Sequence, residues 1–311
     1  MHKLKLGVFC LWMSLTAEAH PKFPTSPYLE RKVRFWERVF AEFKSHQIVI
    51  HDRFEPNVVV GVIDLPDYGY DNPLDPEART LLERQLKLYN EALDDFHKQG
   101  AEARRLSPRH RKIWQAYRQE PTARQRLLAG ETSMRSQGGL ADTFRQAADN
   151  ARLYLPRMER IFRAHGLPPE LTRMVFVESM FNLNARSKVG ASGFWQLMPE
   201  TARAYLKVNR KIDQRNSPFL ATEAAAKILK NNHAVLKSWP LAITAYNHGL
   251  NGMKRAVAQT GTRDLHTIVT SYESPSFGFA SRNFYAEFVA AKRIYEKHKS
   301  RQASKDLAKE R

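Results

Sequence analysis

One carboxylate within an apolar helical segment, residues 170–181, constrains the fold of this chain more than any other feature. Pro168 and Pro169 precede the segment and suit a first helical turn, where missing N–H groups cost little. Glu178 follows Leu171 by seven residues and therefore lies on the same apolar stripe of a buried helix. Burial disfavours the charged form, so the sequence predicts a raised pKa for Glu178 and the role of a general acid.

The alternative is that Glu178 lies at the rim of the stripe and faces water, as most helical glutamates do. A tight turn of small residues at 190–193, followed by Trp195 and Gln196, favours the buried position beside a ligand. Small residues let a backbone approach a ligand closely. A tryptophan ring stacks on the face of a sugar, and an amide recognises hydroxyl or acetamido groups. We therefore expect a saccharide to bind next to Glu178.

Four separated motifs carry a family resemblance. They are Glu178-Ser179, Ser187, the turn at 190–196 and Ala-Tyr-Asn at 245–247. Over residues 167–295 the chain resembles the catalytic domain of the soluble lytic murein transglycosylases, glycoside hydrolase family 23. Within that family it is most similar to the branch of membrane-bound lytic murein transglycosylase D. It departs from the family at Leu183, usually Pro or Ala, and at Phe194, usually aliphatic, which concerns loop shape rather than charge.

The resemblance implies a mainly α fold with a lysozyme-like helical catalytic domain, expected at residues 151–299. It implies that Glu178 is a single general acid/base, with no metal and no cofactor. Supporting or substrate-binding roles are implied for Ser179, Ser187, Gly193, Gln196, Tyr246, Asn247 and Tyr285. The implied substrate is the glycan strand of peptidoglycan. Its β-1,4 bond between N-acetylmuramic acid and N-acetylglucosamine is cleaved without water, which leaves a 1,6-anhydromuramyl product.

The number of carboxylates bears on this mechanism. Ordinary inverting and retaining glycosidases need two carboxylates, about 5 to 9.5 Å apart. The acidic residues that follow Glu178, namely Glu200, Asp213 and Glu223, lie outside the motifs, so no second catalytic carboxylate is predicted. The alternatives are a goose-type lysozyme-like hydrolase and a non-catalytic glycan-binding wall protein.

The charge and the N-terminus indicate an envelope protein. A formal net charge of +18 favours an anionic partner, but the basic residues are spread along the chain without a nucleic-acid-binding signature. Residues 1–19 combine a short basic segment, an apolar run and a small-x-small site, as a cleaved signal peptide does. We therefore expect a periplasmic protein that binds peptidoglycan and no nucleic acid. An uncleaved anchor is the alternative reading of 1–19, and peripheral association with the envelope stays open.

The region expected at 20–150 is helical, with a small β-hairpin formed by 47–51 and 57–65. The predicted helices are 28–43, 75–99, 109–118, 122–128 and, at the junction with the catalytic domain, 145–164. A metal site at His46 and His51 is not expected, because no second ligand pair accompanies them. Residues 135–137 precede a Gly-Gly break, which is typical of a capped turn, although a role in positioning glycan is the alternative. The charged tail, 300–311, is expected to be a solvated helix end.

Overall fold

The computed structural model describes residues 22–65 and 75–309, so the predicted signal peptide lies outside the described residues. The α-helices are α1 Pro27–Ala41, α2 Pro76–Gln99, α3 Pro108–Arg118, α4 Pro121–Ala129, α5 Ala141–Ala164, α6 Met174–Ser179, α7 Pro199–Ala202, α8 Pro218–Leu236, α9 Trp239–His248, α10 Leu250–Thr260, α11 Leu265–Ser271 and α12 Phe279–Lys309. Three 3₁₀ helices are η1 Gly100–Arg105, η2 Pro169–Arg173 and η3 Gln214–Asn216. The strands are β1 Gln47–Asp52, β2 Val59–Asp64 and β3 Met134–Gly138. Among the described helices, none has the length and apolarity needed to cross a membrane.

The predicted fold class is confirmed, since the chain is mainly α with one small antiparallel sheet. The predicted hairpin is present as β1 and β2, but a third strand, β3, pairs with the other edge of β1 and gives the order β2-β1-β3. Residues 135–137 therefore belong to a strand rather than to a capped turn. Residues 134–138 have no alternating apolar pattern in the sequence, so this strand forms only because it pairs with the distant strand β1.

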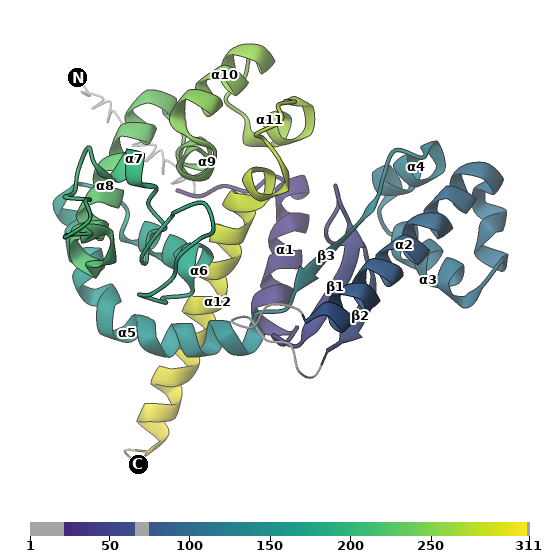
Figure 1. Ribbon diagram of the computed structural model, residues 1–311, viewed down its shortest axis with the longest axis horizontal. Helices are drawn as coiled ribbons and strands as arrows, with labels where there is room; N and C mark the ends of the chain where they lie inside the picture. Colours follow the sequence, from purple (N-terminus) through teal and green to yellow (C-terminus); the bar gives the residue numbers. More distant parts are fainter. Residues whose placement is uncertain (1–21, 66–74, 310–311) are drawn as a thin grey trace, which may run out of the picture.

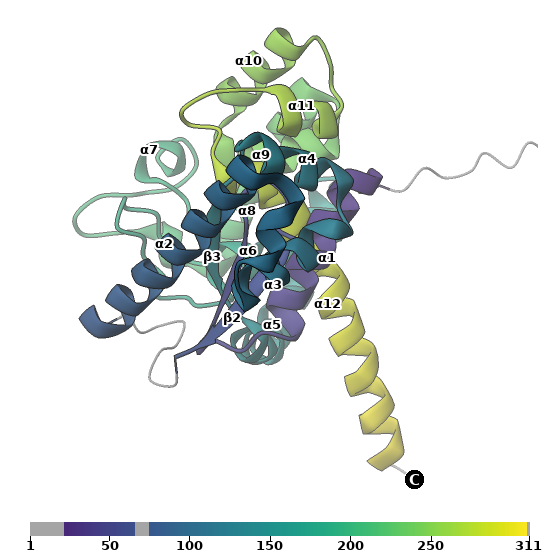
Figure 2. The ribbon, with the colours of Figure 1, turned by 90° about the vertical axis from the view of Figure 1, so that its right-hand side faces the viewer.

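Helices α1 and α12 lie side by side at the centre of the molecule (Figure 1). α1 buries an apolar face that includes Val33, Trp36 and Val39, and these side chains share one core with α5, α6, α8 and α9. α1 precedes the expected catalytic domain in sequence, yet it packs within the same core. Beyond that core the C-terminal half of α12 projects away from the body (Figure 2).

A second, smaller core joins the sheet to α2, α3 and α4. Its largest buried side chains include Phe96 and Tyr117. Asp52, at the end of β1, is fully buried and accepts hydrogen bonds from the hydroxyls of Tyr117 (2.5 Å) and Thr132 (2.6 Å) and from the N–H groups of Phe54 and Glu55. These bonds fix the turn that follows β1 to α3 and to the start of β3.

The expected single helix at 170–181 is wrong in detail. The chain instead forms the 3₁₀ helix η2 and then the short helix α6, which ends at Ser179. Met180 and Phe181 have φ angles of 49° and 53°, in the left-handed region that ends helices. Both side chains are nevertheless buried, and Phe181 packs 4.7 Å from the ring of Phe176, so apolar burial holds the chain in this strained conformation.

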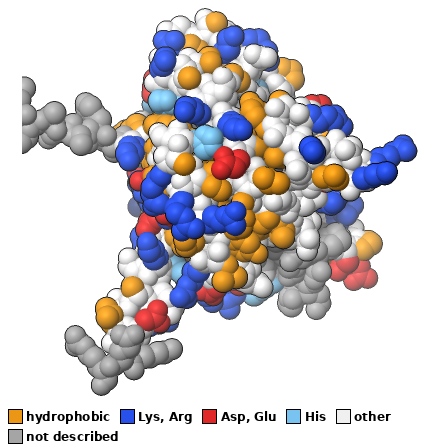
Figure 3. Space-filling model, turned by 90° about the vertical axis from the view of Figure 1, so that its left-hand side faces the viewer, with side chains coloured by type: hydrophobic (Ala, Val, Ile, Leu, Met, Phe, Trp, Pro, Cys, Tyr) orange, Lys and Arg blue, Asp and Glu red, His pale blue; other side chains and the backbone are white. Residues whose placement is uncertain are grey.

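Basic side chains cover much of the surface. Figure 3 shows Lys and Arg residues spread over the side of the molecule that carries α7 and α8, with few Asp and Glu residues among them. On this side of the molecule the basic residues are therefore spread out and not confined to one stripe. This distribution agrees with the spread of basic residues along the sequence.

We predict that Tyr117→Phe lowers the free energy of unfolding by about 1–3 kcal/mol, because the buried Asp52 carboxylate loses a hydrogen-bond donor. Urea denaturation followed by circular dichroism measures this change. Tyr205→Phe is the matched control, because Tyr205 is exposed and surface changes usually stay within about 0.5 kcal/mol. Equal stability of the Tyr117→Phe and wild-type proteins would contradict the structural role of this bond.

Candidate active site

Glu178 lies on the last turn of α6, and α6 packs against η2 and α12. The stripe predicted for this helix is buried, with Leu171, Met174 and Val175 fully inaccessible. The side chain of Glu178 remains half-buried. The carboxyl is therefore largely withdrawn from water but not fully enclosed.

The surroundings of Glu178 favour its protonated form. Burial is the first cause and the nearby carboxylate of Glu287 is the second, and together they raise the pKa of Glu178 to about 8. At neutral pH the side chain therefore carries a proton. A carboxylic acid that is protonated yet accessible has the properties of a general acid.

Tyr246 lies at the C-terminal end of α9 and is half-buried. Its hydroxyl donates to the carbonyl oxygen of Trp195 at 2.9 Å. Burial, and then the negative charge of Glu178, raise the pKa of the Tyr246 hydroxyl, so the two side chains lie close together. The structure therefore brings Tyr246 to Glu178, although the hydrogen bond that it makes is to the main chain of the loop between them.

The loop at 185–198 forms one wall beside Glu178, and several predicted residues shape it. The Ser187 hydroxyl accepts from the N–H of Ala191 at 2.9 Å. The amide of Gln196 donates to the carbonyl oxygens of Ala185 (3.1 Å) and Gly193 (2.8 Å), and its φ angle of 44° is left-handed. In this structure Ser187 and Gln196 bond within the loop and thereby define its shape.

Arg215 holds this loop from outside and was not predicted. Its guanidinium donates to the carbonyl oxygens of Gly190 (2.7 Å) and Leu197 (2.9 Å) and pairs with Asp213 (2.7 Å). Gly193 fits against it: a Cβ at this position would lie 2.1 Å from the carbonyl oxygen of Arg215, and φ is 74°. Glycine is therefore required at 193 for close packing and for backbone conformation.

Two aromatic or polar side chains next to the site are structural. Trp195 is fully buried, stacks on Phe162 at 5.6 Å and donates from its indole N–H to Thr222, so the expectation that its ring stacks on a sugar is wrong. Ser179 is also buried, and its hydroxyl donates to the carbonyl oxygen of Phe194 at 2.9 Å. Ser179 thus links α6 to the loop beneath the site.

Asn247 and Tyr285 lie on α9 and α12. Asn247 is exposed, and its side-chain oxygen accepts from the hydroxyl of Ser281 at 2.8 Å, which links the two helices. Tyr285 is buried, and its hydroxyl donates to the carbonyl oxygen of Pro24 at 2.8 Å. The Tyr285 hydroxyl therefore holds the N-terminal segment.

The acids considered in the sequence did not include Glu287 of α12, whose carboxyl lies close enough to raise the pKa of Glu178. Burial likewise raises the pKa of Glu287 to about 8, and Arg135 of β3 opposes that rise. Glu287 stands within the apolar run 284–291, as Glu178 does in its own helix. The same rule, a carboxylate on a buried helical face, would have identified Glu287 from the sequence. The acids considered at first lie elsewhere: Glu200 is exposed, and Asp213 pairs with Arg215.

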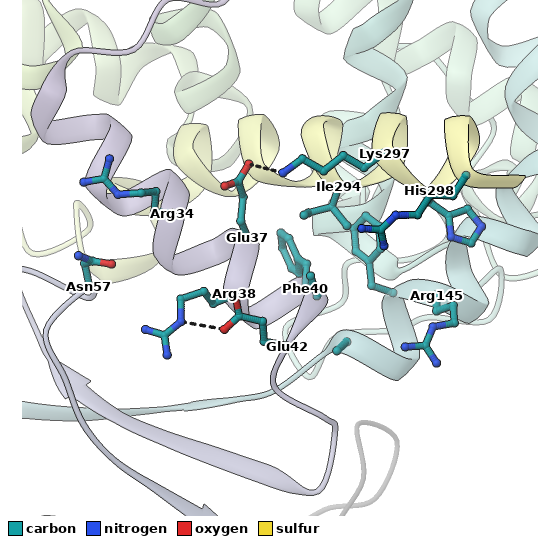
Figure 4. Close-up of a pocket in the computed structure, with 14 residues that line it drawn as sticks. Arg34, Glu37, Arg38, Phe40, Glu42, Asn57, Arg145, Ile294, Lys297 and His298 are labelled. Carbon is teal, nitrogen blue, oxygen red and sulfur yellow. Dashed lines mark hydrogen bonds and ion pairs between the residues drawn. The ribbon is translucent and has the colours of Figure 1, made fainter. Parts of the chain in front are cut away.

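A separate hollow of about 480 Å³ lies between α1, α5 and α12 (Figure 4). Its charged lining is partly paired, with Arg38 3.0 Å from Glu42 and Lys297 3.9 Å from Glu37. None of its lining residues belongs to the four motifs. We therefore locate the candidate active site at Glu178 and not at this hollow.

Comparison with known proteins identifies the segment that contains this site. Residues 160–269 match the family model described as "Transglycosylase SLT domain". These residues form a transglycosylase SLT domain. Over 115 residues the chain is 31% identical to membrane-bound lytic murein transglycosylase D of Escherichia coli strain K12, which covers 36% of this chain and 25% of the relative. The family predicted from the four motifs is thereby confirmed for this segment.

Two solved structures are also similar. Against an inactive mutant of the lytic transglycosylase Slt of Pseudomonas aeruginosa the TM-score is 0.39 and the identity 18%, over 73% of this chain and 38% of that chain. Against the 70 kDa soluble lytic transglycosylase of Escherichia coli the TM-score is 0.39 and the identity 16%, over 71% and 35%. At this TM-score no inference about activity is drawn from the likeness. This chain spans about a quarter of the length of the transglycosylase D that it matches.

We predict that Glu287→Gln lowers the pKa of Glu178, because an amide removes the negative charge that helps to keep Glu178 protonated. The pKa should stay above the ordinary value of a glutamate, since burial is the larger cause. A carbon-detected NMR titration of the glutamate carboxyls measures this. Glu131→Gln, on an exposed position, should leave the Glu178 titration unchanged. An unshifted titration in Glu287→Gln would show that the two carboxyls are not coupled.

Proposed function

We propose that this protein is a peptidoglycan lytic transglycosylase. In this proposal Glu178 cleaves the β-1,4 bond between N-acetylmuramic acid and N-acetylglucosamine. The observation that carries the proposal is an accessible carboxyl whose pKa is raised to about 8, within a segment that matches a transglycosylase SLT domain. One relative that this chain matches is named membrane-bound lytic murein transglycosylase D, and that name supports the same substrate.

In the proposed mechanism Glu178 first acts as the acid. Its carboxyl donates a proton to the glycosidic oxygen as the bond to C1 of the muramyl residue breaks, and the acetamido group of the substrate stabilises the developing cation. The resulting carboxylate then accepts the proton of the muramyl 6-hydroxyl as that oxygen bonds to C1. The proton is returned to Glu178, and the product is a 1,6-anhydro sugar.

Tyr246, Gly193, Ser187 and Gln196 have supporting roles in this proposal. The hydroxyl of Tyr246 on α9 bonds to the carbonyl oxygen of Trp195. In this proposal that bond holds the loop at 185–198 in place beside the Glu178 carboxyl. Gly193, with Ser187 and Gln196, keeps the loop at 185–198 in the shape that leaves Glu178 accessible. We propose 151–299 as the catalytic domain, 20–150 as a preceding region that contributes α1 to its core, and 300–311 as a charged tail.

A hydrolase is the second candidate function, because a second carboxyl, that of Glu287, lies close to Glu178. Ordinary glycosidases use two carboxyl groups in one site, and one of the two activates water. Glu287 would require its ionised form to act as a base, whereas burial raises its pKa to about 8. At neutral pH the route with a single carboxyl is therefore better supported than hydrolysis. We propose that the protein acts on peptidoglycan in the periplasm.

The product distinguishes the two candidates. A muramyl 6-hydroxyl held near C1 acts at an effective concentration of about 10⁵ M or more in well-oriented systems, against roughly 55 M for water. We therefore expect muropeptides that end in 1,6-anhydro-N-acetylmuramic acid, without oxygen from labelled water. Mass spectrometry of products from purified sacculi in labelled water measures this. A reducing muramyl end that carries the label would favour hydrolysis, with Glu287 as the candidate base.

We predict that Glu178→Gln lowers the rate of cleavage at least about a hundredfold, because general acid–base catalysis contributes typically 10²- to 10⁴-fold and an amide cannot donate the proton. The protein should still fold, since glutamine has nearly the same volume. Release of soluble muropeptides is the measurement, with thermal unfolding as the check on folding. Glu200→Gln, on an exposed acid of α7, is the control and should keep its activity. Retention of a tenth of the wild-type rate by Glu178→Gln would refute this assignment.

A further inference from the structure

Two arginines of the N-terminal sheet lie beside the candidate site without a part in the proposed reaction. Arg135 belongs to β3 and stands opposite His51 of β1. Arg53 follows β1 directly, and its N–H donates to the carbonyl oxygen of Ser133 at 3.0 Å, next to the start of β3. Both side chains are exposed. Antiparallel pairing thus brings together two arginines that are distant in sequence.

Arg135 connects this pair to the catalytic half. Its guanidinium lies over the ring of Phe279, 4.2 Å from the ring centre, and Phe279 is the first residue of α12. Glu287 lies two helical turns further along, about 12 Å at 1.5 Å per residue. The charge of Arg135 acts on Glu287, which in turn acts on Glu178. Arg135 therefore lies near Glu287, which is itself close to Glu178.

The charge of Glu287 acts on Arg135, but Glu287 forms no ion pair with it. Within residues 22–65 and 75–309, no carboxylate lies within ion-pair distance of Arg53 or Arg135, whereas other arginines, such as Arg173 and Arg293, have acidic partners. Burial, and then the charge of Arg53, lower the pKa of Arg135, which indicates repulsion between the two guanidinium groups. The neighbouring His51 adds no charge at pH 7, since burial lowers its pKa to about 4. Like charges held together without a partner attract an anion.

The proposed substrate carries one kind of anion that could reach these arginines. The sugar units of the glycan are uncharged where the lactyl group of the muramyl residue is joined to a peptide by an amide bond, and the charge lies on the free carboxylates of that peptide. The muramyl residue is also the sugar whose bond Glu178 cleaves. Its peptide must therefore leave the glycan close to Glu178. An arginine presents two parallel N–H donors that match a carboxylate.

We propose, on the basis of the proposed function, that Arg53 and Arg135 bind a carboxylate of the peptide attached to the muramyl residue that is cleaved. The N-terminal sheet then selects glycan that still carries acidic peptides. This contact is made equally in the ground state and the transition state, so it should act through KM rather than through kcat. It should also weaken with salt, because both arginines are exposed.

The test uses two tetrasaccharide substrates that differ only in charge, one with free peptide carboxylates and one with the same carboxylates amidated. The wild-type protein should show a higher kcat/KM on the free-acid substrate, through a lower KM. Arg53→Gln and Arg135→Gln should each reduce this preference about threefold, and the double variant about tenfold, as expected for exposed ion pairs. Arg53→Lys should restore part of the preference, because the charge remains but the two-pronged geometry is lost.

Arg160→Gln is the matched control, because Arg160 is an exposed arginine of α5 outside the site. It should leave both kcat/KM values at the wild-type level. Equal KM values of the wild type on the two substrates, or an unchanged preference in the double variant, would overturn the proposal. An equal loss on both substrates would also overturn it. Absence of cleavage of both substrates by the wild type would instead refute the proposed function itself, which separates the two failures.

Discussion

Removal of water from the Glu178 carboxyl is the constraint on which the rest of the site depends. A carboxyl that is exposed loses its proton well below neutral pH and has none to give to a leaving group. Here the short helix α6 sets Glu178 against α12 and Tyr246, so that burial opposes its ionisation, and ionisation of Glu287 at higher pH would oppose it further. The side chain is nevertheless half-buried rather than fully enclosed. Protonation and access to substrate are thus obtained in one position.

Most of the motif that surrounds Glu178 contributes shape rather than direct chemistry. Ser179, Ser187 and Gln196 direct their hydrogen bonds to main-chain groups of the adjacent loop. Arg215 closes that loop from behind, against Gly193. The loop is irregular, so its main-chain groups need side-chain partners to hold one conformation.

Part of the N-terminal region packs into the same core as the elements that carry the candidate site. α1 packs into the same core as α6 and α12, and the buried amino group of Lys32 donates to the carbonyl of Phe54 and the side chain of Asn283. These contacts fix the sheet against the first turns of α12. The position of β3, and with it Arg135, is therefore set by the same packing that positions Glu287.

The sequence by itself determined the helices with clear apolar periodicity, the first two strands and the unusual position of Glu178 on a buried face. These features are local: a stripe at helical spacing, a Pro or Asp at a helix start, or a carboxylate where an apolar residue is expected can each be read within a few turns. Glu287 also stands where an apolar residue is expected on a helical face, so the same local rule could have identified it from the sequence. Tertiary structure alone decided the break after Ser179, the burial of Trp195, the strand β3 and the meeting of Glu287 with Arg135. Each of these depends on residues far apart in the chain, because burial and charge proximity arise only when separate elements pack together.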